Sequence, residues 1–360
     1  MELNGSVMSR DTEVAKVENG DIVSFDESRL PLYLRRTKDV TGWLASRAID
    51  AHRTNSRLLK RALRIRSSDD LETVLRVNAA TITDAYWFRE QGSALTYADV
   101  VFKENLFDKL ALYGDADSFN NPYSPTPELT NTGSFEKCWR LIDGKWWMYK
   151  SGNENERFSE LFIYEFGTRL GIPMARYEAD GGYIRSLDFT DGAKLNFEPA
   201  SSVMGDNEDY AANFAAFQGF GSDIARRYVE MLYLDTLCFN MDRHTQNYGV
   251  LRDPDSGDVV SFAPLFDHNI ALISRGYPKI ERQNDKLVEL FADFLKAAPE
   301  AMELFKGMDF PTIDDSFILK CCDAVPIKAN REFIVDFIIN GKRQLDERIE
   351  QQQDFGQQIK

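Results

Sequence analysis

Three polar residues with a defined spacing could carry out phosphoryl transfer. Asp242 and Asn247 are five positions apart in the polar run NMDRHTQN (240–247), and Asp267 follows twenty positions later in PLFDH. Carboxylate and amide oxygens suit a hard cation such as Mg²⁺, and a remaining carboxylate could accept the proton of a substrate hydroxyl. The order D-x-x-x-x-N…D, a base followed by a metal-binding amide and a metal-binding acid, is the arrangement that phosphoryl transfer uses. Taken singly, each residue would be an ordinary turn or cap residue.

A nucleotide would also require a loop that binds its phosphates, and one candidate lies upstream. The run TGSFEK (132–137) contains Gly133 and Ser134, small residues whose backbone amides could face phosphate oxygens. The run matches neither GxGxxG nor a Walker A motif, so it is a weak signal by itself. Lys137 could contact phosphate, or it could be a lysine of the following strand without a role in binding.

A second lysine and a histidine complete the set of candidate nucleotide contacts. Lys150 ends the strand-like run WWMYK, and Glu160 lies one turn into the helical pattern that follows. An ion pair from Glu160 could aim the Lys150 ammonium at phosphate. His244, one of three histidines in the protein, lies inside the polar run beside Asp242.

Four segments together resemble the HipA-like kinases, the bacterial persistence-toxin family of serine/threonine kinases, which are related in fold to protein and phosphatidylinositol kinases. The resemblance extends over about residues 128 to 275. Its most specific part is NxDRHxxN followed by PL[FY]D, and the glycine loop is less specific. The segments are GSFEKCWRLIDGKWWMYK, ENERFSELFIYEFGTRLGI, NMDRHTQNYGVL and APLFDH.

The resemblance implies a role for each matching residue. Asp242 would be the catalytic base, and Asn247 and Asp267 would hold Mg²⁺. Lys150 would contact the phosphates of ATP, with Glu160 as the partner of that lysine.

The resemblance also implies which backbone segments would bind the nucleotide. Residues 133–137 would form the phosphate loop. By chain order alone, the strand that ends at Glu198 would be the hinge beside the adenine. Some family members carry a phosphorylatable serine three positions before the loop glycine, where this chain has Thr130, with Ser134 nearby.

The implied function is an ATP- and Mg²⁺-dependent kinase that phosphorylates a Ser or Thr hydroxyl on a protein, including itself. A toxin of a toxin–antitoxin system with an antitoxin-like partner is implied as well. Two alternatives stay open: a kinase of a small molecule or lipid headgroup, and a catalytically silent nucleotide-binding regulatory module. The acidic character and the lack of a basic amphipathic anchor argue against a lipid. The complete set of polar positions argues against a silent module.

The elements that must position these residues predict an α+β, two-lobed protein-kinase-like fold. Its parts would be a small strand-rich N-lobe, a mainly helical C-lobe and an extra helical N-terminal segment. An Asp-Gly turn at 143–144 predicts a hairpin in the N-lobe. The expected boundaries are a disordered leader over 1–28, the helical segment over 29–125, the N-lobe over 126–200 and the C-lobe with the catalytic loop over 201–360.

Composition narrows the function classes. The 360 residues include 43 Lys plus Arg and 58 Asp plus Glu, a net charge of −15 that disfavours direct nucleic-acid binding. A basic stretch over 35–66 is interpreted as a solvated helix face, with a docking patch as the less favoured reading. The four cysteines form no C-x-x-C pair and indicate reduced thiols. Neither a membrane-spanning run nor a secretory signal is visible, so we expect a cytoplasmic protein without membrane partners.

Overall fold

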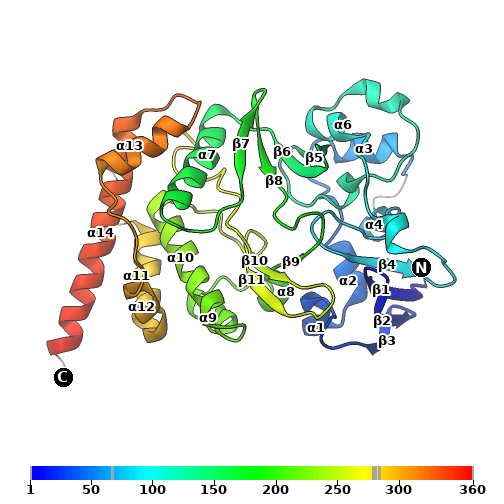
Figure 1. Ribbon diagram of the computed structural model, residues 1–360, viewed down its shortest axis with the longest axis horizontal. Coiled ribbons are helices and arrows are strands. Elements are labelled where there is room, and N and C mark those ends of the chain that lie inside the picture. Colours follow the sequence, from blue (N-terminus) through cyan, green and yellow to red (C-terminus); the bar gives the residue numbers. More distant parts are fainter. Residues whose placement is uncertain (1, 66–68, 278–281, 283–284, 359–360) are drawn as a thin grey trace. The chain divides into compact units, whose positions relative to one another are not determined.

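The computed structural model describes residues 2–65, 69–277, 282 and 285–358 (Figure 1). The chain divides into two compact units, each assembled from separate stretches of sequence. Unit 1 comprises residues 1–151, 180–203 and 249–260, and unit 2 comprises residues 152–179, 204–248 and 261–360. Within the described residues, no helix combines the length and the apolar character needed to cross a membrane.

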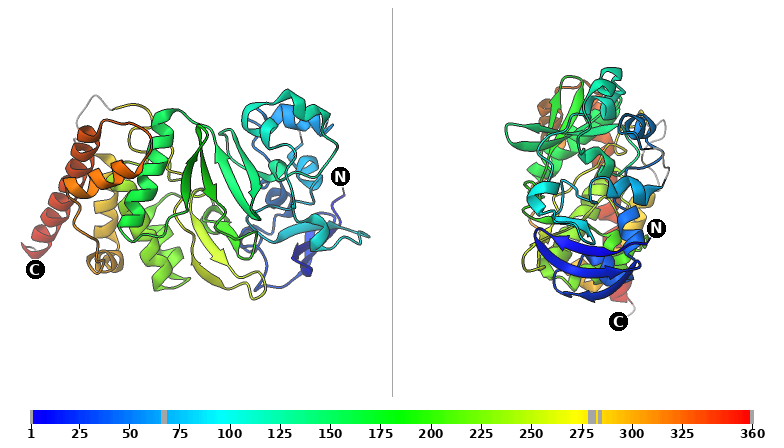
Figure 2. Two further views of the ribbon diagram at one scale, coloured as in Figure 1. Left: turned by 45° about the horizontal axis from the view of Figure 1, so that its top comes forward. Right: turned by 90° about the vertical axis from the view of Figure 1, so that its right-hand side faces the viewer.

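An antiparallel sheet of four strands lies at the N-terminal end of unit 1, with strand order β3-β2-β1-β4. Three of its strands form successive hairpins, drawn in blue in Figure 2. The predicted disordered leader over residues 1–28 is therefore wrong. Val7, Val14 and Val17 are buried in a cluster that also includes residues from the neighbouring helices. The strands are β1 (Gly5–Ser9), β2 (Thr12–Glu18), β3 (Asp21–Phe25) and β4 (Tyr86–Glu90).

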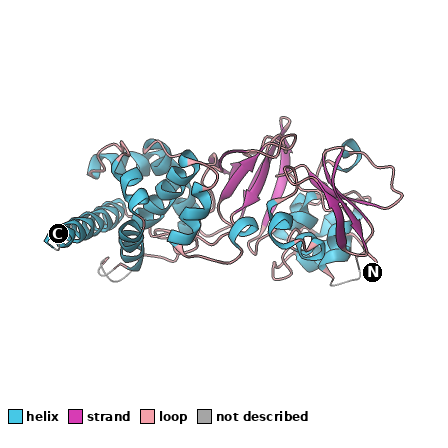
Figure 3. Ribbon diagram, turned by 90° about the horizontal axis from the view of Figure 1, so that it is seen from below, coloured by secondary structure: helices cyan, strands magenta, loops and turns pink. Residues whose placement is uncertain are grey.

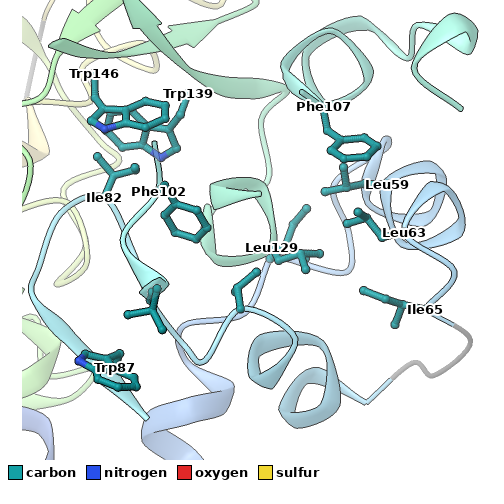
Figure 4. Packing of buried hydrophobic residues seen from close by; sticks show 14 of the residues in the cluster. Leu59, Leu63, Ile65, Ile82, Trp87, Phe102, Phe107, Leu129, Trp139 and Trp146 are labelled. Atoms are coloured by element: carbon teal, nitrogen blue, oxygen red, sulfur yellow. The ribbon is translucent and has the colours of Figure 1, made fainter. Parts of the chain in front are cut away.

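Short helices separated by loops follow over residues 29–65 and 69–130, where a helical segment was expected over 29–125, and β4 interrupts them. Leu59, Phe107 and Leu129 belong to one apolar cluster, which Figure 4 shows from close by. The helices are α1 (Leu32–Thr37), α2 (Val40–Ala45), α3 (Ser56–Ala62), α4 (Asp70–Leu75), α5 (Tyr97–Val100) and α6 (Asp108–Tyr113), with 3-10 turns η1 (Ala116–Asn120) and η2 (Pro127–Thr130).

A second sheet contains the predicted hairpin and has strand order β5-β6-β8-β7. Asp143 and Gly144 form its turn with φ values of 50° and 73°, the left-handed conformation of a tight two-residue turn. This turn sets a register in which Lys137 lies opposite Lys150. The strands are β5 (Lys137–Ile142), β6 (Lys145–Lys150), β7 (Tyr177–Asp180) and β8 (Tyr183–Leu187).

A third sheet brings together strands that are distant in sequence, with order β11-β10-β9. Strands β8 and β9 follow one another in the sequence but belong to different sheets, β8 to the second and β9 to the third. The strands are β9 (Asn196–Pro199), β10 (Gly249–Arg252) and β11 (Val259–Phe262).

Unit 2 is mainly helical, as Figure 3 shows for the C-terminal part of the chain. Helix α7 begins at a reciprocal capping box between Asn153 and Glu156 and is followed by Gly171 at φ 80°. Helix α10 is buried along nearly its whole length from Tyr228 onward. The helices are α7 (Glu154–Arg169), α8 (Ser201–Met204), which begins in unit 1, α9 (Tyr210–Gln218), α10 (Ser222–Cys238), α11 (Lys286–Ala297), α12 (Pro299–Lys306), α13 (Asp315–Ala324) and α14 (Arg331–Gln358).

The two units differ from the contiguous lobes that the sequence suggested. Helix α7 belongs to unit 2 although it lies within the expected N-lobe, and residues 249–260 belong to unit 1 although they lie within the expected C-lobe. Residues 29–125 share unit 1 with the hairpin of β5 and β6. The expected C-lobe also includes residues 278–281, 283–284 and 359–360, which are outside the described residues.

Candidate active site

The loop that contains Asp242 begins where α10 ends. Phe239 has φ 54° and stops the helix in the left-handed conformation. The Asn240 side chain then joins helix to loop: its Nδ2 donates to Asp235 Oδ1 at 2.8 Å, and its Oδ1 accepts from the Asp242 amide at 3.2 Å. Asn240 is buried. The backbone at Asp242 is thus fixed by a side chain of the loop itself.

Arg243 connects this loop to the segment that contains Asp267. Its buried guanidinium forms a two-pronged ion pair with Asp235, with Nε–Oδ2 at 2.7 Å and Nη2–Oδ1 at 3.0 Å. The Nη1 group donates to the carbonyl oxygens of Asn247 at 2.6 Å and Phe266 at 2.9 Å. One planar cation therefore fixes two loops of unit 2.

One hydrogen bond joins Asn247 to Asp242, and burial affects the Asp242 carboxyl. Asn247 Nδ2 donates to the Asp242 carbonyl oxygen at 3.0 Å, so Oδ1 is the oxygen that its side chain can offer to a cation. The Asp242 carboxyl is half-buried, and this burial raises its pKa, as does the negative charge of Asp267. His244 and Arg243 lower the same pKa, by a smaller effect than burial.

Asp267 occupies a backbone conformation that non-glycine residues rarely adopt, with φ 62°. Its amide donates to Tyr177 Oη at 3.2 Å, and the preceding carbonyl is bound by Arg243. On its other side, the His268 amide donates to Glu160 Oε1 at 3.0 Å. A left-handed residue costs about 1 kcal/mol and persists where its surroundings hold it, as these contacts do.

Glu160 is fully buried on α7 and joins that helix to the segment after Asp267. Its predicted ion pair with Lys150 joins residues of different units, and it stays a prediction. His244 is only partly exposed, and its Nδ1 accepts from the Gln246 amide at 3.3 Å.

The residues in unit 2 offer oxygen donors that fit Mg²⁺. In the described part of the chain no three His, Cys, Asp or Glu side chains gather into a metal cluster. Mg²⁺ is usually held by one or two carboxylates and keeps several waters, so an amide oxygen and a carboxylate are a sufficient protein contribution. Asn247 and Asp267 would be these ligands, and Asp242 would stay available to a hydroxyl proton.

The predicted phosphate loop lies in unit 1. Gly133 has φ 95°, and residues 132–135 are exposed. The Lys137 side chain folds back over the loop, because a Cβ added at Gly133 would lie 2.6 Å from Lys137 Nζ. Lys150 lies opposite Lys137 in the hairpin, and opposed residues of antiparallel strands project from the same face. The side chains of Lys137 and Lys150 therefore project from the same face of the hairpin, and this hairpin directly follows the loop.

Thr130 and Ser134 differ sharply in exposure. Thr130 is buried in η2, where its hydroxyl donates to the Ala80 carbonyl at 2.7 Å, and Ser134 is exposed in the loop. Of the two hydroxyls, only that of Ser134 is accessible to a kinase in this conformation.

The Glu198 side chain has a structural role. Its buried carboxylate accepts from the Leu32 amide at 2.5 Å and from Tyr86 Oη at 3.2 Å, and it pairs with Arg252. Both side-chain oxygens are therefore engaged inside unit 1, and the expected hinge beside the adenine stays a prediction.

Sequence reasoning missed Asp235, Asn240, Arg243 and His268. The signal for Asp235 was present, since it is a carboxylate eight positions before an arginine and lies among apolar residues of α10. A charged side chain on the buried face of a helix requires a partner. Asn240 and Arg243 belong to the NxDRHxxN motif, and the sequence contains His268, but the contacts of these three residues are visible only in the folded chain.

Neither a known protein-family profile nor a curated protein matches the sequence. Among solved structures, HipA of Shewanella oneidensis MR-1, determined with HipB and its operator DNA, matches with a TM-score of 0.57 at 12% identity, covering 96% of this chain and 97% of that chain. The Helicobacter pylori proinflammatory kinase CtkA matches with a TM-score of 0.48 at 18% identity, over 61% of this chain and 95% of that one. The FAT and kinase domain of CtTel1 gives a TM-score of 0.23 at 11% identity, over 86% of this chain and 32% of that one.

The likeness to HipA establishes that this chain has a HipA-like kinase fold, and it confirms the predicted α+β class. It extends beyond the segment that the sequence motifs suggested, because it covers 96% of this chain.

Proposed function

We propose that this chain is an ATP- and Mg²⁺-dependent kinase that transfers the γ-phosphate to a Ser or Thr hydroxyl of a protein, itself included. The observation that carries the proposal is the Arg243 contact set, which joins the Asp242–Asn247 loop to the Asp267 segment. A turn or cap role for these residues would not require that connection. The kinase-like fold is the context in which such a set performs phosphoryl transfer.

Each residue would contribute positioning or charge. Bound Mg²⁺ would neutralise charge on the phosphates, and Asn247 and Asp267 would hold it. Asp242 would orient the acceptor hydroxyl and accept its proton, for which the raised pKa of its carboxyl is favourable. Lys137, Lys150 and the amides around Gly133 and Ser134 would bind phosphate oxygens.

The biological setting is part of the same proposal. The HipA structure that this chain resembles was determined with HipB and operator DNA. We propose by analogy a cytoplasmic toxin kinase with an antitoxin-like protein partner. Direct binding of DNA is not proposed, because the net charge of −15 opposes it.

Transfer of labelled γ-phosphate tests the proposal. Wild type would be compared with Asp242→Ala and Asp267→Ala, using the protein itself and a generic protein acceptor. Asp309→Ala is a matched control, because Asp309 is an exposed carboxylate of unit 2. We expect incorporation by wild type and Asp309→Ala, and loss of at least about a hundredfold in the other two variants.

Other outcomes would redirect the proposal. ATP binding without transfer to any protein would favour a small-molecule acceptor or a regulatory binding module. Absence of ATP binding by wild type would contradict the kinase proposal altogether.

A further inference from the structure

A buried ion pair in unit 1 lies outside the set of residues that the kinase motifs define. Arg53 and Glu128 have fully buried side chains, with Arg53 Nη2 and Glu128 Oε2 3.3 Å apart. Glu128 directly precedes Leu129, which belongs to the apolar cluster shown in Figure 4. Removing two charges from water is costly, and apolar residues of similar volume are often at least as stabilising as a buried ion pair. Stability alone therefore does not account for this ion pair, and the groups that the two side chains contact indicate what else it does.

The pair contacts both ends of the predicted phosphate loop. Before the loop, Arg53 Nη1 donates to the Asn131 carbonyl at 3.3 Å, and Asn131 Nδ2 donates to Glu128 Oε2 at 2.9 Å. After the loop, Arg53 Nη2 donates to the Lys137 carbonyl, and the Trp139 amide donates to Glu128 Oε1 at 2.6 Å. Two side chains thus set the separation between the ends of the loop.

Asn105 extends this arrangement on the side of β5. Its Nδ2 donates to Glu128 Oε1 at 2.9 Å and to the Trp139 carbonyl at 2.8 Å. Glu128 therefore accepts from four residues, two of which border the loop.

The loop between these anchors has little structure of its own. Residues 132–135 are exposed, and within the described residues their amides donate no backbone hydrogen bond. Their arrangement must therefore depend on the fixed positions of Asn131 and Lys137. Amides that are held in place before a ligand arrives bind it with a smaller entropic cost.

We propose that Arg53 and Glu128 are positioning residues that clamp both ends of the phosphate loop and hold its amides ready for the phosphates of ATP. The inference rests on the proposed kinase function. It assigns part of the basic 35–66 stretch to the nucleotide site, through contacts inside unit 1 and not through an exposed docking face.

Glu128→Gln tests the clamp, because it keeps the shape of the side chain but removes its charge and replaces one acceptor oxygen with a donor. The matched control is Asp84→Asn, which alters the buried Arg47–Asp84 ion pair of the same unit, with Arg47 Nη2 2.8 Å from Asp84 Oδ1. The other hydrogen bonds of the Arg47 and Asp84 side chains are with Ala79, Thr81 and Tyr86, which lie outside the loop. Arg53→Lys is a second variant that keeps the charge but loses the planar set of donors.

Three measurements separate positioning from folding: the melting temperature, the kinetic constants for ATP, and hydrogen exchange of a peptide spanning residues 131–139. For Glu128→Gln we expect a KM and Kd for ATP about tenfold higher, with kcat changed less than about threefold, and faster exchange in the loop. Asp84→Asn should lower the melting temperature without raising the KM for ATP. If Glu128→Gln does not fold, Arg53→Lys is expected to show the same pattern more weakly.

The clamp and the kinase proposal fail in different ways. If wild type binds ATP and both clamp variants bind it equally well with unchanged loop exchange, the clamp is refuted and the kinase proposal stands. If wild type binds no ATP, a phosphate-binding role for the loop is refuted together with the kinase proposal.

Discussion

At the residue scale, the Asp242 carboxyl is the proposed proton acceptor, and its partial burial has a cost in the stability of the folded state. Its burial raises the pKa, so the folded state binds a proton at this group more tightly than the unfolded state does. The charge of Asp242 therefore lowers stability as the pH rises through the interval between its unfolded and folded pKa values. A group placed for proton transfer is expected to show such a cost.

This cost gives a prediction for Asp242→Asn. Without Mg²⁺ and nucleotide, we expect its melting temperature at neutral pH to equal or exceed that of wild type, although transfer activity is lost. The gain should disappear below the ordinary Asp pKa of 3.8, because the wild-type carboxyl is then also neutral. Melting curves between pH 3.5 and 7.5, on the order of half a unit apart, would measure this. A markedly lower melting temperature at neutral pH would show that the charge has a structural role.

At the scale of the elements, the connection between α10 and the loop that contains Asp242 depends on Asp235. Asp235 accepts from both Asn240 and Arg243, so it fixes the end of the helix and the loop together. Helix α10 is buried along most of its length and provides a rigid base for this contact.

Asp235→Ala should be strongly destabilising because it leaves the Arg243 guanidinium buried without its carboxylate. We expect a loss on the order of 3 kcal/mol in the free energy of unfolding of unit 2. The control Asp346→Ala removes a half-exposed partner of Lys342 on α14 and should cost less than about 1 kcal/mol. Urea unfolding followed by the circular dichroism of helices would compare them, because unit 2 is mainly helical. Equal costs for the two variants would contradict the role assigned to Asp235.

Elements with local signals were predictable from the sequence. The Asp143–Gly144 hairpin follows from a turn dipeptide, and the helical pattern after Lys150 corresponds to α7; the structure confirms both. The first sheet was missed although Asn19-Gly20, a strong hairpin signal, lies between β2 and β3. Its strands carry charged residues at exposed positions. In addition, β1 pairs with β4, with Gly5 opposite Glu90, and no local sequence pattern reveals a pairing between residues so far apart in the chain.

The candidate site shows the same division. The ordered acids and the amide were predictable because their spacing is contained in the sequence. The residues that hold them were not, since Arg243 acts on carbonyl groups that only the folded chain places nearby.

At the scale of the whole molecule, an acidic protein places arginines in its interior. Five of the ion pairs between described residues have both side chains at most 10% exposed, and the cation of each of these five is arginine. Two of them, Arg47 and Arg53, belong to the basic 35–66 stretch, so the expectation of a single solvated face is wrong for these two. Arg57, Arg61 and Arg64 are exposed, and Arg66 is outside the described residues.

Nucleotide binding should be visible as a change in the stability of the whole protein. ATP with Mg²⁺ at about a hundred times its Kd should stabilise the folded state by about 2.7 kcal/mol and raise the melting temperature by several degrees. Removing Mg²⁺ with a chelator should abolish most of this shift, since Asn247 and Asp267 would then lack the ion that joins them to phosphate. A shift of equal size without Mg²⁺ would contradict their assignment as metal ligands.

The third sheet affects when unit 1 can finish folding during synthesis of the chain, because it includes strands from residues 249–262. Arg252 donates to the carbonyl oxygens of Ser28 at 2.7 Å and Leu30 at 3.1 Å and pairs with Glu198, so the N-terminal part of unit 1 is completed by residues from the last third of the chain. On the ribosome, the growing chain must therefore expose that surface until residue 260 has emerged from the exit tunnel. A prematurely terminated product ending before residue 249 would retain Glu198 without its arginine, and we expect it to depend on chaperones or be degraded.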